Sequence, residues 1–177
     1  VTKGEDQLWT AVKHSVNGVD SRYVGYLDPD LFVDHAVELN NPITISGATR
    51  ANPVVITATA HGLSDGDQVD IENVAGMIEL NNKRYTVNNQ TTNTFELQNI
   101  EPTPVNVNGT AYTTYLSGGE ARLCVTTLSG LDYLEGESIE IVDRDTIVYS
   151  NVTVSGGSVT IPNSERVSRV YAGKQYN

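Results

Sequence analysis

Apolar and polar residues alternate over short stretches of this chain, and turn-forming residues interrupt each stretch after a few positions. Alternation with a period of two is typical of β-strands that bury one face. The clearest pair of stretches, 7–16 and 19–27, flanks Asn17-Gly18, a dipeptide that favours the tight turn of a hairpin. We therefore predict an antiparallel hairpin near the N-terminus. Residues 31–39 fit either a short helical turn or another strand.

The middle of the chain shows the same alternation in shorter pieces, divided by Gly-, Asn- and Pro-containing turns. Short strands with frequent turns predict a small antiparallel barrel or sandwich. The predicted strands are 43–49, 54–59, 68–72, 83–88, 94–98, 113–116 and 120–126.

The C-terminal part of the chain continues the pattern with further strands and tight turns. We predict turns at Asp143-Arg144-Asp145 and Gly156-Gly157. The predicted strands are 137–142, 146–150, 152–155, 158–161 and 166–172. We predict an all-β protein in which a small antiparallel β-barrel module, 43–125, is inserted between hairpins of a flanking β-domain formed by 1–42 and 126–177.

Composition supports this class and narrows the choice of partners. Val, Thr and Ile make up 51 of the 177 residues, and these β-branched residues suit strands better than helices. The 22 acidic and 11 basic residues give a net charge of -11, which argues against binding to nucleic acid or to an anionic membrane. The sequence shows neither a long apolar run nor a signal peptide.

Histidines are the first candidates for chemistry, but their spacing does not match a metal site. His14, His35 and His61 lack the spacing of zinc ligands, so we expect no metal. His61 could be a general base beside Asp65 or Asp67. It could also be a turn residue whose ring caps the backbone, and this interpretation is favoured because no nucleophile signature accompanies it.

Acidic residues are dense at Asp65, Asp67, Asp70 and Glu72, but they do not follow the spacing of an EF-hand calcium loop. Asp143 and Asp145 flank a turn, where aspartate commonly bonds to the backbone. A catalytic pair of carboxylates is neither supported nor excluded there.

Cys124 lies in an apolar run and is expected to be a small buried residue. A reactive thiolate would need a neighbouring positive charge, for which Arg122 is the candidate. The Gly-Gly pairs at 118–119 and 156–157 lack the helix and Lys of a phosphate-binding loop, so both are predicted turns. We expect no enzyme activity, no catalytic residue and no cofactor.

Tyrosines are numerous and allow two interpretations. They could form a sugar-stacking surface or a protein interface, or each could be an ordinary half-buried strand residue. The tyrosines considered are Tyr23, Tyr26, Tyr112, Tyr115 and Tyr133. The sequence identifies no interface residue.

The segments NPVVIT, AHGLSDGDQVDI, GMIELNNKRYTV and NTFEL follow one another within residues 47–98. In this order they resemble a recurring module of bacteriophage virion proteins. That module is itself similar to the first catalytic-cysteine half-domain of ubiquitin-activating enzymes, a small β-barrel. The catalytic cysteine of those enzymes belongs to another half-domain, so the resemblance gives Cys124 no role.

The flanking segments carry the resemblance further. QLWTAVKHSVNGVDSRYVGYLDP and GLDYLEGESIEIVDRDTIVYSNVTVSGGSVTIP resemble the segments before and after this module in tail proteins of short-tailed phages and prophages. The turn at Asp143-Arg144-Asp145, where the family more often has Asp-Gly, and the ending RVYAGKQYN depart from the family pattern. Family members are longer, and this chain resembles their C-terminal part.

The resemblance implies a structural component of the virion, in a tail tube, nozzle or adaptor, located in the phage tail. Its partners would be copies of itself or other virion tail proteins, and no catalysis is required. The alternative is a glycan-binding β-module of a host-recognition adhesin. The tyrosines and the Asn- and Thr-rich loops at 88–94 and 102–114 favour that alternative, because binding residues often lie on loops of a rigid scaffold.

Overall fold

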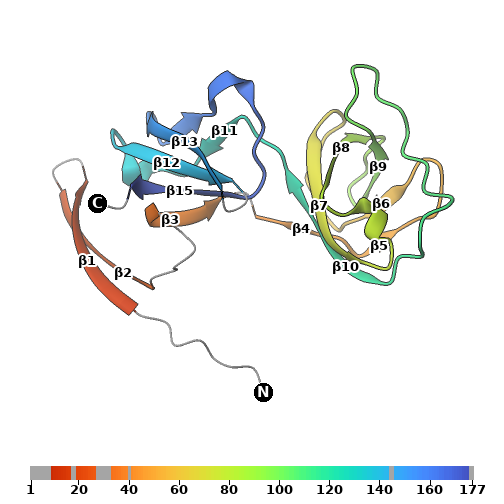
Figure 1. Ribbon diagram of the computed structural model, residues 1–177, viewed down its shortest axis with the longest axis horizontal. Helices are drawn as coiled ribbons and strands as arrows, with labels where there is room; N and C mark the ends of the chain where they lie inside the picture. Colours follow the sequence, from red (N-terminus) through yellow and green to blue (C-terminus); the bar gives the residue numbers. More distant parts are fainter. Residues whose placement is uncertain (1–8, 17–18, 27–32, 40, 144–145, 176–177) are drawn as a thin grey trace. The chain divides into compact units, whose positions relative to one another are not determined.

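The computed structural model describes residues 9–16, 19–26, 33–39, 41–143 and 146–175. Strands joined by turns and three short 3-10 helices make up the described residues, which confirms the predicted all-β class. The chain divides into two compact units, Asn40–Val125 and a second one formed by Val1–Leu39 with Thr126–Asn177. Figure 1 shows the strands of both. No helix among the described residues has the length and apolar character that crossing a membrane requires.

A curled antiparallel sheet of seven strands forms the unit Asn40–Val125, here called the barrel unit. Its strand order is β4-β10-β7-β8-β9-β6-β5, and the short helix η1, Ile78–Leu80, follows β7. The strands are β4 Ile43–Thr44, β5 Gly47–Ala48, β6 Val55–Thr57, β7 Gln68–Ala75, β8 Lys83–Asn88, β9 Thr94–Gln98 and β10 Ser117–Leu123.

The two edges of this sheet meet because they belong to one stretch of chain. β4 pairs with β10 and β5 pairs with β6, and only Ile45 and Ser46 separate β4 from β5. The Ile45 amide donates to the Gly119 carbonyl at 2.9 Å, and the Ser46 amide donates to the Thr57 carbonyl at 2.8 Å. The chain therefore leaves one edge of the sheet and joins the other within two residues, which curls the sheet into a barrel.

Alternate residues of these strands point inward and fill the barrel, as the period of two requires. The core is aliphatic around Phe95, and the only sulfur-containing side chain within it is Met77. The buried members are Ile45, Val54, Ile56, Ala58, Leu63, Val69, Ile71, Val74, Met77, Leu80, Tyr85, Val87, Phe95, Leu97, Val107 and Ala121. All of them lie between 40 and 125, so the barrel unit has a core of its own.

The end of the barrel unit differs from the sequence-based prediction. No strand forms at 113–116, and β10 begins earlier than predicted, at Ser117. Gly118 and Gly119 lie within β10 instead of forming a turn, with φ angles of +70° and +102°. An added Cβ on Gly119 would meet Val74 Cγ2 at 2.7 Å. The Gly-Gly pair therefore serves the close packing of β10 on its neighbours.

The other unit, here called the flanking unit, contains a four-stranded antiparallel sheet in the order β13-β12-β15-β3. A two-stranded sheet pairs β11 with β14. The elements are β3 Val33–Leu39, β11 Thr127–Ser129, η2 Asp132–Leu134, β12 Ser138–Asp143, β13 Thr146–Thr153, β14 Ser158–Thr160, η3 Pro162–Ser164 and β15 Val170–Gln175. Its buried residues include Leu131, Leu134, Ile139, Ile141, Ile161 and Val170.

Several boundaries of the flanking unit differ from the prediction. The ambiguous segment 31–39 contains a strand, β3, which pairs with β15. β14 forms its ladder with the unpredicted strand β11, while the predicted hairpin around Gly156-Gly157 keeps only the bridge Ser155↔Ser158. Sequence alternation could not show these long-range pairings. The predicted turn residues Arg144 and Asp145 lie outside the described residues.

The predicted N-terminal hairpin is present as β1, Trp9–Val16, and β2, Val19–Tyr26. The strands pair antiparallel over their whole length, from Trp9↔Tyr26 to Val16↔Val19. The turn residues 17 and 18 lie outside the described part. Within the described residues, β1 and β2 form a sheet of their own that has no third strand.

Candidate functional site

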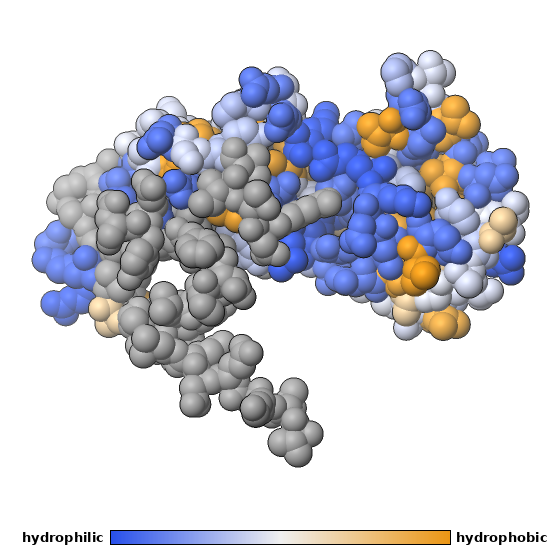
Figure 2. All heavy atoms as spheres, viewed as in Figure 1, coloured by the Kyte–Doolittle hydropathy of each residue, from blue (hydrophilic) through white to orange (hydrophobic). Residues whose placement is uncertain are grey.

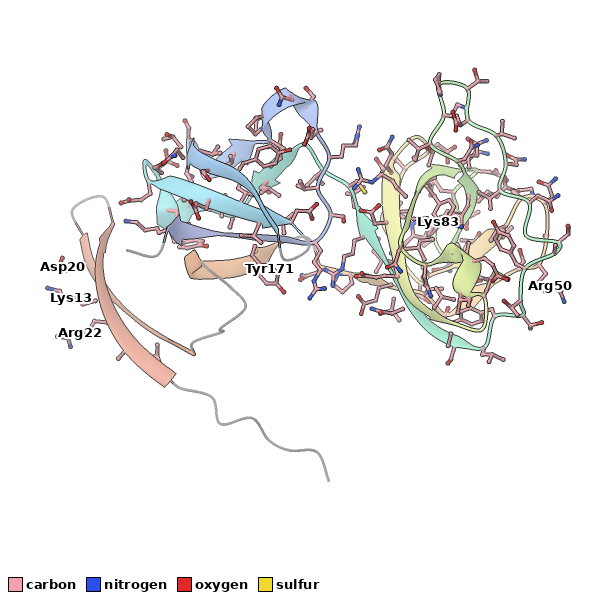
Figure 3. All side chains as sticks on the ribbon, in the orientation of Figure 1. Lys13, Asp20, Arg22, Arg50, Lys83 and Tyr171 are labelled. Atoms are coloured by element: carbon pink, nitrogen blue, oxygen red, sulfur yellow. The ribbon has the colours of Figure 1, made fainter. Side chains whose placement is uncertain are left out.

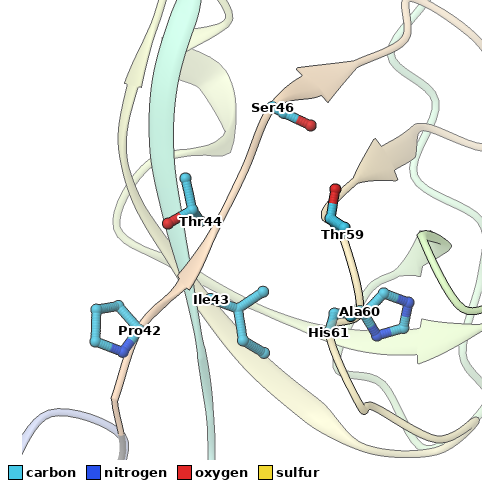
Figure 4. Close-up of a pocket in the computed structure, with 7 residues that line it drawn as sticks. All are labelled: Pro42, Ile43, Thr44, Ser46, Thr59, Ala60 and His61. Atoms are coloured by element: carbon cyan, nitrogen blue, oxygen red, sulfur yellow. The ribbon is translucent and has the colours of Figure 1, made fainter.

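A shallow hollow lies at the edge of the barrel unit, between β4 and the chain that follows β6 (Figure 4). It forms because β4 pairs with β10, and the chain first reaches β6 at Ser46, whose amide and hydroxyl both donate to the Thr57 carbonyl. Its volume is about 360 Å³. The lining residues are Pro42, Ile43, Thr44, Ser46, Thr59, Ala60 and His61. The lining contains hydroxyls, aliphatic groups and one imidazole, and no carboxylate.

His61 is held as part of the turn that precedes β7. Its Nδ1 accepts the Leu63 amide at 3.0 Å, and its Nε2 lies 3.3 Å from the Thr94 carbonyl. The ring also meets Phe95 edge-on, with 5.1 Å between the ring centroids. Since Nδ1 is an acceptor, the neutral ring carries its proton on Nε2 and donates it to the carbonyl. Neither nitrogen is left to take a proton from a substrate, which favours the turn interpretation.

The neighbouring aspartates also bond to backbone amides. Asp67 accepts the Ser64 amide at 2.8 Å, and Asp65 accepts the Gln90 amide at 2.9 Å. The first bond closes a turn within the loop between β6 and β7, and the second holds that loop against the turn after β8. Across the described residues, no three His, Cys, Asp or Glu side chains gather where they could hold a metal ion.

Asp70 belongs instead to a row of charges across three strands. Arg84 on β8 donates to both Asp70 carboxylate oxygens at 2.8 Å, a bidentate pair. Arg122 on β10 stands opposite Asp70 in register and pairs with Glu72 at 3.1 Å and Glu120 at 3.2 Å. Asp70 and Arg122 are 5 % and 7 % exposed. The row therefore ties β10, β7 and β8 together and is structural.

Cys124 is a free thiol with 1 % of its surface exposed. Its sulfur lies 3.8 Å from the Arg122 carbonyl, and the Arg122 guanidinium is engaged by Glu72 and Glu120. A nucleophile must reach solvent or substrate, so this position suits the predicted packing role.

The tyrosines whose side chains are described are buried or half-buried, and none of these forms an open aromatic platform. The Tyr115 hydroxyl lies within hydrogen-bond distance of the Ile45 and Gly118 carbonyls, 3.2 Å and 2.9 Å away, at the junction of β4 and β10. Burial raises the pKa of Tyr85 well above its usual value. The hydrogen bond to Glu165 raises the pKa of Tyr149 to about 12. These hydroxyls are part of the scaffold.

For the remaining candidate residues, the structure describes either a position in a secondary-structure element or nothing at all. Asp143 is half-buried at the end of β12, and Asp145 lies outside the described residues. His14 and His35 lie on β1 and β3, but their side chains are not described. The same holds for the side chains of Tyr23 and Tyr26 on β2. Tyr133 is half-buried in η2.

Unpaired strand edges distinguish the flanking unit more clearly than any of these side chains. The sequence alone did not identify which strands have them. β3 and β13 end the four-stranded sheet, and each pairs on one side only among the described strands. The β1–β2 hairpin has two such edges. Its described side chains, Ala11, Lys13, Asp20, Arg22 and Val24, are all exposed. Figure 3 shows Lys13, Asp20 and Arg22 projecting from the hairpin.

The barrel unit also exposes large aliphatic side chains near one another. Ile78 in η1 is 64 % exposed, and Leu116, just before β10, is 73 % exposed. The Leu116 amide donates to the Ala75 carbonyl, which brings the loop before β10 against the end of β7. Elsewhere on the visible face, hydrophobic residues are scattered among hydrophilic ones (Figure 2).

Residues 51–124 match the family model described as the ubiquitin-activating enzyme E1 FCCH domain. The match begins before β6, ends after β10 and falls within the barrel unit. It confirms the resemblance of the middle of the chain to this half-domain. No curated protein matches the chain.

Proposed function

We propose that this chain is a structural component of a bacteriophage virion, in a tail tube, nozzle or adaptor. It acts through protein–protein assembly without catalysis. The observation that supports this most is the β1–β2 hairpin, which has no further strand beside it among the described residues. A two-stranded hairpin is marginally stable alone in water and needs a further surface. Assembly with another protein would supply that surface.

The open edges of the four-stranded sheet add to the support. β13 presents eight residues without a single charge, from Thr146 to Thr153. Protective charges on an edge strand normally hinder pairing with another chain, and β13 lacks them. Exposed Ile78 and Leu116 are a second apolar surface, on the barrel unit.

The phage context is supported by the sequence resemblance of the module together with both flanking segments. The match to the E1 half-domain covers residues 51–124, so it supports the module itself, and the phage context rests on the sequence resemblance. Free strand edges can make assembly contacts with another chain, and a catalytic cleft is not required.

The test is size-exclusion chromatography with light scattering, followed by electron microscopy of any large species. We expect a defined oligomer, either of this chain alone or with neighbouring tail proteins, and ring-shaped particles. A chain that stays monomeric in both settings and binds immobilised glycans would reject the proposal and support the adhesin alternative.

A further inference from the structure

Among the strands of the flanking unit, β1 and β3 each leave one edge without a partner among the described strands. β1 pairs with β2 alone, and β3 pairs with β15 alone. Every ladder in the described structure is antiparallel, so an antiparallel addition would continue the existing architecture. An edge of this kind can accept a strand from another chain.

The two strands carry opposite charges. Lys13 is the only Lys, Arg, Asp or Glu in β1. β3 holds two acidic residues, Asp34 and Glu38, and neither Lys nor Arg. Lys174 on β15 stands opposite Asp34 in register, but its ammonium bonds to Glu137 at 2.8 Å. The charges on β3 therefore favour an incoming strand that brings a cation.

Lys13 is available for such a contact. Its side chain is 59 % exposed, and it forms an ion pair with Asp20, whose side chain is 57 % exposed. An exposed pair of this kind contributes little to stability, so exchanging its partner costs little. Arg22 stands opposite Lys13 in register, which adds a second cation to the hairpin.

The connection between β2 and β3 prevents β1 from reaching β3 of its own chain in this way. If β1 lay antiparallel between β2 and β3, then β2 and β3 would run parallel to each other. Parallel strands need a crossover of about a dozen residues or more. Only residues 27–32 join Tyr26, the end of β2, to Val33, the start of β3.

We propose that β1 of one copy pairs antiparallel with β3 of a second copy. The four-stranded sheet would then have six strands, with the order β13-β12-β15-β3 continued by β1 and β2 of the neighbour. This inference deepens the proposed function by naming a self-assembly contact. If each copy both donates and accepts a hairpin, the contact closes into a pair or ring, or continues as a filament.

The first experiment is disulfide crosslinking between two different full-length chains. One chain carries Lys13→Cys, and the other carries Asp34→Cys or Glu38→Cys. Opposed residues of an antiparallel ladder have Cα atoms about 4.5–5.5 Å apart, within disulfide range. We expect a crosslinked heterodimer when the chains are mixed. The wild-type chain, whose Cys124 is buried, is the control.

The second experiment reverses the charge on β1 but keeps the hairpin's own ion pair and net charge. The double variant Lys13→Glu/Asp20→Lys places an anion opposite the acidic β3. We expect self-association, measured by analytical ultracentrifugation, to weaken about tenfold or more. Mixing this variant with Asp34→Lys/Glu38→Lys restores association. Lys83→Glu, an exposed change on β8, leaves it unchanged.

The outcomes separate this contact from the proposed function. A third chain carries both Lys13→Cys and Asp34→Cys. If this chain crosslinks only within itself, β3 is completed by the hairpin of its own chain, and the inference is overturned. If the charge reversal leaves self-association unchanged and no crosslink forms, the inference is also overturned. Assembly through β13 or through the barrel unit would remain possible in that case. Absence of self-association would overturn it too, and would leave only assembly with other proteins.

Discussion

Gly76 stands where the chain leaves β7, and its φ of +87° is one that L-residues rarely adopt. An added Cβ would meet the Thr114 carbonyl at 2.2 Å and the Leu116 amide at 2.8 Å. Backbone atoms of the loop before β10 therefore occupy the space of a side chain. At this position, close packing and conformation both require glycine.

Gly66 allows these two requirements to be separated. Its φ is +91°, and an added Cβ would meet nothing within 4 Å. We expect Gly66→Ala to cost about 1–2 kcal/mol of unfolding free energy, because only the backbone is strained. Gly76→Ala should cost about 2 kcal/mol more, because the clash adds to the strain. Urea denaturation of both variants measures the difference, and equal costs would contradict the packing argument.

Glu79 and Thr113 offer a test by pH. The Thr113 hydroxyl and amide donate to the Glu79 carboxylate at 2.7–2.8 Å. The hydroxyl is the main cause that lowers the pKa of Glu79 below 4.5. A carboxyl with a lowered folded-state pKa contributes stability that is present above its unfolded pKa and lost as pH falls through the folded pKa.

We expect Thr113→Val to raise the pKa of Glu79 toward its usual value. It should destabilise the protein at neutral pH more than at a pH below the folded-state pKa of Glu79, where the carboxyl is protonated in both states. Carboxyl-carbon NMR titration and urea unfolding at the two pH values give the measurements. Thr113→Ser keeps the hydroxyl and should behave as wild type. An unchanged Glu79 titration in Thr113→Val would contradict the assignment.

At the scale of elements, the charge row on β10, β7 and β8 connects three strands through buried Asp70 and Arg122 and their partly exposed partners. Removing the Asp70 charge leaves the Arg84 guanidinium without its bidentate carboxylate, next to the Arg122 cation on the neighbouring strand. We expect Asp70→Asn to cost about 3 kcal/mol or more in urea unfolding, because a buried pair is broken from one side. The exposed Lys13–Asp20 pair is the comparison, and Asp20→Asn should cost about 0.5 kcal/mol or less. If Asp70→Asn costs as little unfolding free energy as Asp20→Asn, the charges of the row are exposed to solvent.

Elements were predictable from the sequence where the determining contacts are local. Alternation with Asn17-Gly18 predicted the β1–β2 hairpin, because strand period and turn chemistry lie within one short segment. The same pattern did not decide whether residues 31–39 formed a strand, because β3 depends on pairing with distant β15. Gly118 and Gly119 were assigned to a turn, since a bend and a closely packed strand both select glycine.

The roles of the candidate site residues were likewise predictable only where they depend on neighbouring residues in the sequence. The turn interpretation of His61 follows from the residues around it, and its two hydrogen bonds support that interpretation. The charge row was missed, because Asp70, Arg84 and Arg122 come together only through strand register. The unpaired edges were missed for the same reason, since a sequence shows a strand but not its number of neighbours.

At the scale of the whole molecule, the barrel unit is a continuous segment with a complete core, whereas the flanking unit is built from two segments. We expect residues 40–125, expressed alone, to fold cooperatively, which calorimetry would show as a single transition. The intact chain should show two transitions, one of which matches the fragment. A fragment without a cooperative transition would mean that the barrel depends on the flanking unit.

The pairing of β4 with β10 also determines how the barrel responds to mechanical force. Ile43 pairs with Ala121 and Thr44 with Glu120, so the chain enters and leaves the barrel at the same end of one ladder. Tension applied through these two ends separates the strands from that end and breaks the hydrogen bonds in sequence instead of together. The barrel should therefore open at low force in a single-molecule pulling experiment, releasing roughly 280 Å of extended chain.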